Sequence, residues 1–134
     1  MASRNESSFK MTPQRAAILG CLEGDKSHPS AEEIYRRVKR RMPMISFATV
    51  YKTLDTLRDN GMLRELSIDP ARKRFDPDTS AHHHAICTEC GRIEDVFVDY
   101  RINLPGAVRQ KFSLMEGNHV EFYGRCTECG AAGE

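Results

Sequence analysis

The sequence has no apolar run near the roughly 20 residues that a membrane-spanning helix requires, so we predict no transmembrane segment. Its first 15 residues, MASRNESSFKMTPQR, lack the apolar stretch of a secretory signal. We therefore expect a cytoplasmic protein, in a compartment where structural disulfides are rare. The helical metalloprotease motif H-E-x-x-H is also absent, which argues against one class of metal-dependent enzyme.

The chain lacks a large excess of either charge, because its formal net charge is only +1, but the two parts of the chain differ. Residues 1–80 carry 15 Lys and Arg against 11 Asp and Glu, whereas residues 81–134 carry 5 against 8. A basic first part suggests a polyanionic partner, although ordinary surface charge explains the excess equally well. With 134 residues, 40% of them hydrophobic, the chain can form one ordinary domain or two small ones.

Three short helices are predicted in the basic part from their capping signals. A Thr or Ser precedes each helix, and a Pro follows the Thr of the first. At the second helix, Glu33 lies three positions after Ser30 and completes a capping box. A Gly closes the third helix. The expected helices cover residues 13–23, 31–41 and 46–60.

The third predicted helix has two distinct faces. Its apolar residues recur at helical spacing and should be buried. They are Phe47, Val50, Leu54 and Leu57. A second face is small, polar and cationic, and we expect it to be exposed because a buried lysine is improbable. It comprises Thr49, Lys52, Thr53 and Thr56.

Two short strands, residues 63–68 and 72–75, are predicted on either side of an Asp69-Pro70 turn. Three helices followed by a hairpin outline a winged helix-turn-helix, and in helix-turn-helix proteins the last helix reads the DNA major groove. A helical domain whose third helix is merely solvated is the alternative. The pattern favours DNA binding over that alternative.

Residues 77–81, PDTSA, have the composition of a hinge, and a small α+β unit is expected beyond them. Its expected elements are strands at 82–87, 92–98 and 119–126 and a helix at 104–112. Three short strands make a small sheet, so we expect the unit to pair with a second copy. The predicted domains are a winged-helix DNA-binding domain at 1–76, a hinge at 77–81, and a dimerisation and metal-binding domain at 82–134.

The motif CTECG occurs twice, at residues 87–91 and 126–130. Two Cys-x-x-Cys pairs supply the four thiolates of a closed structural zinc site, and the glycine after each pair permits a tight turn. The 35 residues between the pairs exceed the usual zinc-ribbon gap, but an intervening helix and strand still let the pairs meet. A thioredoxin-like redox pair is the competing interpretation, and two matched pairs favour zinc. The expected ligands are Cys87, Cys90, Cys126 and Cys129, whereas Cys21 is expected in the core.

Histidines gather just before the first cysteine pair. Side chains alternate between the faces of a strand, so His82 and His84 should share a face while His83 points away. Asp76 precedes the hinge and Asp95 lies in the next predicted strand, where both come within reach of the histidine pair. Imidazoles with carboxylates suit iron, manganese or zinc in an open site, unlike the thiolate set. A solvated histidine run is the alternative.

Two other classes of function compete with a metal- and DNA-binding protein. A metal-dependent hydrolase needs a general base beside an open metal site. The run His119-Val120-Glu121 reads H-x-E, as in zinc deaminases, but Ile86 and Arg125 replace the Pro that precedes the deaminase Cys-x-x-Cys. A purely structural zinc module has no use for the basic helix or the His/Asp set. We therefore expect that the protein is not an enzyme.

Taken together, these motifs resemble the ferric uptake regulator family of metal-dependent repressors along nearly the whole chain. The matching segments are MTPQRAAIL (11–19), HPSAEEIY (28–35), ISFATVYKTLDTL (45–57), RFD (74–76), HHHAICTECGRIED (82–95) and FYGRCTECG (122–130). The resemblance implies an N-terminal winged helix and a C-terminal α+β dimerisation domain, with zinc on the four cysteines. It also implies a regulatory metal between the domains that sets their orientation for DNA.

The resemblance further implies a regulatory site for Fe²⁺ or Mn²⁺. Its ligands would be His28, Asp76, His82, His84 and Asp95. Asp at both carboxylate positions is similar to peroxide-sensing members, in which metal-catalysed oxidation of a histidine ligand, here His28 or His82, releases the repressor from DNA. An iron- or other metal-responsive uptake repressor without peroxide chemistry is the alternative. A further metal site of many iron-uptake members falls here on Ala81, His83 and His119 and is incomplete.

A homodimer on a roughly palindromic DNA duplex is also implied, with the helix at 46–60 in the major groove. The expected DNA contacts are Arg15, Ser46, Thr49, Tyr51 and Lys52. We expect no membrane partner and no small-molecule substrate beyond peroxide.

Overall fold

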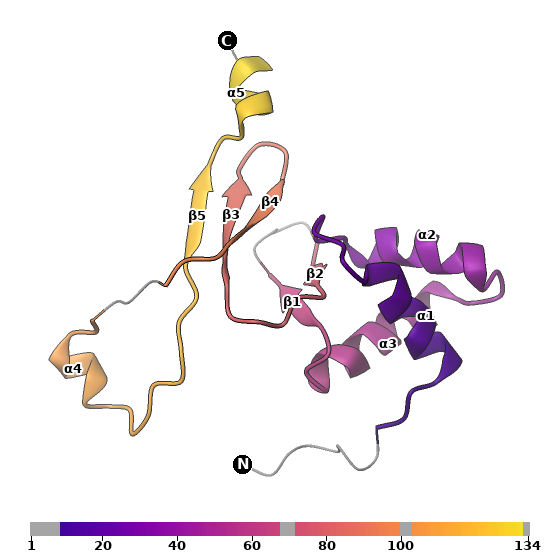
Figure 1. Cartoon of the computed structure of the whole chain (residues 1–134), viewed down its shortest axis with the longest axis horizontal. Coiled ribbons are helices and arrows are strands. Elements are labelled where there is room, and N and C mark those ends of the chain that lie inside the picture. The colour runs from indigo at the N-terminus through magenta and orange to yellow at the C-terminus, as the bar shows by residue number, and fades with distance from the viewer. Residues whose placement is uncertain (1–8, 68–71, 100–102, 133–134) are drawn as a thin grey trace. The chain divides into compact units, whose positions relative to one another are not determined.

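The computed structural model describes residues 9–67, 72–99 and 103–132 and divides the chain into two compact units, residues 1–80 and 81–134 (Figure 1). The first unit is mostly helical and the second is built on a sheet, which confirms the predicted α+β class. The predicted hinge at 77–81 lies across the boundary of the units. In the described part of the chain, no helix is long and apolar enough to span a membrane.

The first unit consists of three helices followed by a two-stranded antiparallel sheet. These elements are α1 (Pro13–Leu22), α2 (Ala31–Arg41), α3 (Phe47–Asp59), β1 (Arg64–Leu66) and β2 (Arg74–Asp76). The predicted caps are confirmed, because Thr12, Ser30 and Ser46 each accept a hydrogen bond from the backbone N–H three residues on. Gly61 adopts a left-handed φ of 73° just after α3. The predicted Asp69-Pro70 turn lies outside the described residues.

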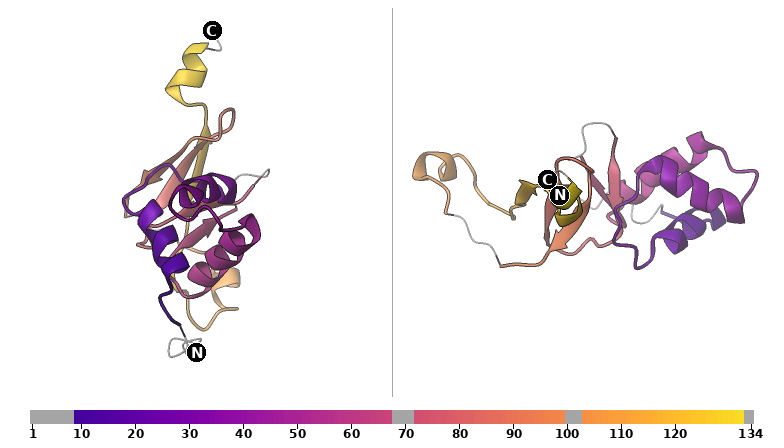
Figure 2. Two further views of the ribbon diagram at one scale, coloured as in Figure 1. Left: turned by 90° about the vertical axis from the view of Figure 1, so that its right-hand side faces the viewer. Right: turned by 90° about the horizontal axis from the view of Figure 1, so that it is seen from above.

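The core of the first unit lies where α1, α2 and α3 pack together, as Figure 2 shows from two directions. Its fully buried side chains are Ile18, Leu22, Ile34, Val38, Val50, Leu54, Leu57 and Phe75. Each helix places apolar residues three or four positions apart, so one stripe of each faces the others. This unit therefore has the hydrophobic core of an independent small domain.

Two predictions about the faces of α3 are wrong. Phe47 is 38% exposed, because it lies at the first turn of α3, where its ring meets Tyr35 edge-on and Tyr51 at a tilt, with ring centroids 5.5 and 5.9 Å away. Thr53 is only 8% exposed, although its position suggests a polar surface. Its hydroxyl donates to the Thr49 carbonyl at 2.7 Å, which removes most of the cost of burying it.

The second unit contains a three-stranded sheet with β3 (His83–Cys87) in the centre. β4 (Ile93–Val96) pairs with it antiparallel and β5 (Glu121–Gly124) pairs with it parallel. The predicted helix at 104–112 is reduced to the four residues of α4 (Gly106–Arg109). A further short helix, α5 (Thr127–Ala132), is absent from the prediction because its sequence, TECGAA, reads as a metal-binding turn.

Few apolar side chains are buried in the second unit. Among its described residues, those buried are Ile86, Cys87 and Ile93. Large hydrophobic side chains instead remain exposed, including Phe97, Val108, Phe112, Leu114, Phe122 and Tyr123. So little burial contributes weakly to folding, and so much exposed apolar surface is typical of a protein–protein contact.

Candidate metal centres and nucleic-acid interface

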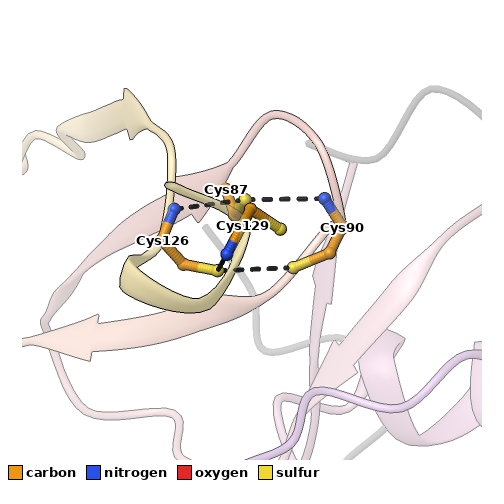
Figure 3. A group of neighbouring side chains, drawn as sticks. All are labelled: Cys87, Cys90, Cys126 and Cys129. Atoms are coloured by element: carbon orange, nitrogen blue, oxygen red, sulfur yellow. Dashed lines mark hydrogen bonds between the residues drawn. The ribbon is translucent and has the colours of Figure 1, made fainter. Parts of the chain in front are cut away.

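The four cysteines of the two CTECG motifs converge in the second unit (Figure 3). The four sulfur atoms all lie within 4.8 Å of one another, and the Sγ atoms of Cys90 and Cys126 are 3.8 Å apart. Strand pairing explains the convergence: β3 and β5 run parallel with Cys87 opposite Gly124, so the two strands bring their Cys-x-x-Cys pairs to the same end of the sheet. Four sulfurs at this separation suit tetrahedral zinc.

Backbone N–H groups prepare the first of these thiols for a metal. The N–H of Cys90 and the N–H of Cys126 donate to the Cys87 sulfur at 3.5 and 3.3 Å and lower the pKa of Cys87 to about 6. Cys129 behaves oppositely, because its contacts with the Cys126 and Cys90 thiols raise its pKa to about 12. The set thus combines a thiol that ionises readily with one that needs a cation beside it, which fits a divalent metal.

The two cysteine motifs differ in backbone conformation. Gly91 has a φ of 78°, as a tight turn after Cys90 requires. The matching expectation for Gly130 is wrong, because Gly130 lies inside α5 and its N–H donates to the Cys126 carbonyl at 2.8 Å. Cys126 immediately precedes α5 and Cys129 lies three positions on in its first turn, so the start of the helix brings the two cysteines together without a glycine turn.

In the first unit, His28 and Asp76 form a buried pair. The His28 Nε2 and Asp76 Oδ2 atoms are 3.4 Å apart. His28 lies in the loop before α2, and Asp76 ends β2; the loop and strand meet because the Phe75 N–H donates to the Pro29 carbonyl at 2.9 Å. Among the described residues, His28 is the one non-glycine with a left-handed φ, at 54°. An imidazole kept at a position that favours glycine indicates that the side chain is needed there.

In the second unit, His82, His84 and Asp95 form a second cluster. The Asp95 Oδ1 lies 3.1 Å from His82 Nε2 and 3.5 Å from His84 Nε2, because Asp95 stands opposite His84 in the β3–β4 register. His83 points to the other side, where its Nδ1 accepts the Val120 N–H at 2.9 Å. This is the alternation of faces expected for a strand.

The contact between this cluster and His119 was not predicted from the sequence. His119 Nε2 lies 2.8 Å from His84 Nδ1, on the ring edge opposite Asp95. His119 is 35 residues from His84, and only the pairing of β5 beside β3 brings the two rings together. A partner at Nδ1 fixes the tautomer of a histidine and leaves Nε2 available as a ligand.

Each unit thus carries part of the predicted regulatory ligand set: His28 and Asp76 in the first unit, His82, His84 and Asp95 in the second. Imidazole nitrogens and carboxylate oxygens are donors for Fe²⁺, Mn²⁺ or Zn²⁺. Carboxylates this well buried need a cation or a hydrogen-bonding partner, so both clusters fit metal binding chemically.

The predicted DNA contacts lie on the first unit, four of them at the N-terminal half of α3. A groove runs between the start of α1 and α3, lined by Thr12, Gln14, Arg15, Thr49, Lys52, Thr53 and Thr56. Lys52 is exposed beside it, and Ser46 caps the helix through the Thr49 N–H at 3.1 Å. Tyr51 lies outside this lining: its ring contacts the Phe47 ring at a tilt and lies under the Lys73 ammonium. The groove therefore combines donors and positive charge, the groups that bind a phosphate backbone.

Known proteins share both sequence and fold with the chain. The ferric uptake regulator family model matches residues 6–111. The peroxide operon regulator of Bacillus subtilis (strain 168) is 39% identical over 131 residues, covering 92% of this chain and 86% of that protein. The solved Campylobacter jejuni peroxide stress regulator is 31% identical with a TM-score of 0.68, covering 87% of this chain and 89% of that one. The Helicobacter pylori ferric uptake regulator, at 22% identity, matches in fold with a TM-score of 0.74 and covers 94% of this chain and 85% of its own.

Proposed function

The chain belongs to the ferric uptake regulator family, and we propose that it is a cytoplasmic, metal-dependent DNA-binding repressor that senses peroxide. It acts on DNA and has no substrate other than peroxide. The observation that carries the proposal is that the chain has two chemically different sets of candidate metal ligands. Four thiolates lie in one unit, and an open His/Asp set is spread over both.

DNA binding is assigned to the first unit. Its three helices and two-stranded wing provide a winged helix-turn-helix, and Lys52 and Arg15 supply positive charge to the groove beside α3. A homodimer places two such helices on a roughly palindromic site, about 34 Å apart or a multiple of that distance. The exposed apolar residues of the second unit support pairing of two copies.

Zinc on Cys87, Cys90, Cys126 and Cys129 has a structural role in this proposal. A set of four thiolates leaves no open coordination position, so the ion cannot take part in a reaction. It joins the end of β3 to α5 and compensates for the sparse apolar core of the second unit.

The regulatory ion is held by His28, Asp76, His82, His84 and Asp95. Because two of these residues belong to the first unit and three to the second, the ion favours conformers in which the two sets are near each other. A ligand shifts a conformational equilibrium by its differential affinity for the two states, and DNA binding is coupled to metal in this way.

Peroxide sensing is favoured over simple metal sensing by the pair of aspartates and by the peroxide regulators among the relatives. When bound, Fe²⁺ supplies the electrons that reduce peroxide, whereas Mn²⁺ supports DNA binding with little reaction. The protein contributes the target: a histidine ligand held beside the ion, His28 or His82. Oxidation of that ring removes a donor, lowers metal affinity and releases DNA.

Mass spectrometry of the iron-loaded dimer before and after dilute peroxide tests this proposal. One added oxygen atom on a peptide that contains His28 or His82 is expected, and the manganese-loaded protein is the control that should stay unmodified. An unmodified iron-loaded protein that still binds DNA after peroxide would identify a metal-responsive uptake repressor instead. Asp95→Glu keeps the charge but lengthens the ligand, and it should weaken the peroxide response more than DNA binding.

A further inference from the structure

We propose that Arg74 is a positioning residue that holds His28 in its ligand conformation and so controls the affinity of the regulatory site. The inference rests on the proposed function, because it assumes that His28 and Asp76 bind the regulatory ion. Arg74 is not itself a ligand. It lies in β2, two residues before Asp76, within the first unit.

The contacts of Arg74 are directed at the loop that carries His28. Arg74 is only 8% exposed, and its Nε donates to the His28 carbonyl. Its Nη2 donates to the Ser27 carbonyl at 3.3 Å. The backbone adds a bridge between Ser30 and Arg74, so the guanidinium and the strand hold the same short segment.

The loop needs such support because its conformation is unfavourable by itself. A left-handed φ of 54° at His28 is costly for a residue with a Cβ. In this conformation the carbonyls of Ser27 and His28 both meet Arg74. A guanidinium offers several N–H donors in one rigid plane, so it can satisfy two adjacent carbonyls that a lysine ammonium meets less well.

The other side of the loop is held independently. The Asp25 carboxylate accepts the Ser27 N–H at 2.8 Å and pairs with Arg37 of α2. These contacts end at Ser27, so they fix the entry to the loop but not the backbone of His28 itself. The hydrogen bond from Arg74 Nε, in contrast, acts directly on the carbonyl of the ligand residue His28.

Strand β2 thereby positions both candidate metal ligands of the first unit, His28 and Asp76. Alternation along β2 places Arg74 and Asp76 on one face and Phe75 on the other, where Phe75 is buried in the core. Asp76 is positioned directly and His28 through Arg74, which yields the 3.4 Å separation of Nε2 and Oδ2. Loss of Arg74 leaves every ligand in the chain but removes this pre-alignment, and affinity falls when ligands must be ordered on binding.

The test measures Mn²⁺ binding to the zinc-loaded, full-length protein, with free Mn²⁺ followed by electron paramagnetic resonance. The proteins compared are the wild type, Arg74→Met, Arg74→Lys and a control, Leu66→Ala. Leu66 is buried in β1 and stands opposite Arg74 in the β1–β2 register, so its loss loosens the wing beside Arg74 while the guanidinium that donates to the His28 loop stays in the chain. Arg74→Met should weaken Mn²⁺ binding at least tenfold, and Arg74→Lys should fall between it and the wild type. Leu66→Ala should lower the thermal midpoint while changing Mn²⁺ affinity less than threefold.

A second readout is independent of the metal. Hydrogen exchange of metal-free protein should be faster over residues 25–30 in Arg74→Met, but unchanged there in Leu66→Ala. Unchanged exchange together with wild-type Mn²⁺ affinity in Arg74→Met overturns the inference, as does equal loss of affinity in the control. If Arg74→Met does not fold, Arg74→Lys decides by the same two measurements. Absence of Mn²⁺ binding in the wild type instead refutes the proposed function.

Discussion

The two units of this chain are stabilised by different means. The first contains a continuous core of fully buried side chains contributed by α1, α2, α3 and the wing. The second buries few apolar residues among those described and gathers four cysteines at one end of its sheet. A unit with its own core keeps its fold when its ligands change, whereas a unit with so little apolar burial depends on metal and on a partner.

Removal of one zinc ligand should have the largest effect, because it should unfold the second unit and leave the first unit folded. Cys90→Ser is expected to lose zinc and to give a disordered or monomeric second unit, because structural zinc contributes on the order of 10 kcal/mol, which is comparable to the stability of a small domain. Metal analysis, gel filtration and circular dichroism measure the outcome, and the helices of the first unit should persist. Cys21→Ser is the control, since Cys21 packs against the core of the first unit. A folded, dimeric, zinc-free Cys90→Ser protein would contradict the assignment.

Chelation should distinguish the two metal sites in the wild-type protein. Four thiolates hold zinc far more tightly than a His/Asp set holds iron or manganese, so a mild chelator should remove only the second metal. DNA binding should then be lost while zinc and the dimer persist. Metal content and DNA affinity are measured on the same samples during chelation. Joint loss of both metals, or DNA binding that survives loss of the second, would show that the sites do not have separate roles.

A single DNA contact should have the smallest effect. Lys52→Ala is expected to weaken DNA binding and to reduce the slope of log affinity against log salt by about 1, the loss of one phosphate contact. Lys39→Ala on α2 is the matched control, because its ammonium packs against Tyr35 away from the groove. Titrations at several salt concentrations measure the slope. If affinity and slope are unchanged in Lys52→Ala, Lys52 is not a DNA contact.

Local signals in the sequence were sufficient to locate the three helices of the first unit. The caps at Thr12, Ser30 and Ser46 begin the three helices as predicted, because capping involves residues only three positions apart. Helical periodicity correctly assigned Val50, Leu54 and Leu57 to the core. It failed at Phe47 and Thr53, where the end of a helix and a local hydroxyl bond outweigh periodicity.

The candidate metal ligands were recognisable from the sequence as residue types, because Cys-x-x-Cys pairs and alternating histidines have short, regular spacing. The contacts that orient them were not. Arg74 lies 46 residues from His28, and His119 lies 35 residues from His84. Hydrogen bonds over such separations depend on which strands and loops pair, and no local pattern records that pairing. The sequence by itself determined which atoms can bind metal; only the tertiary structure decided how those atoms are held.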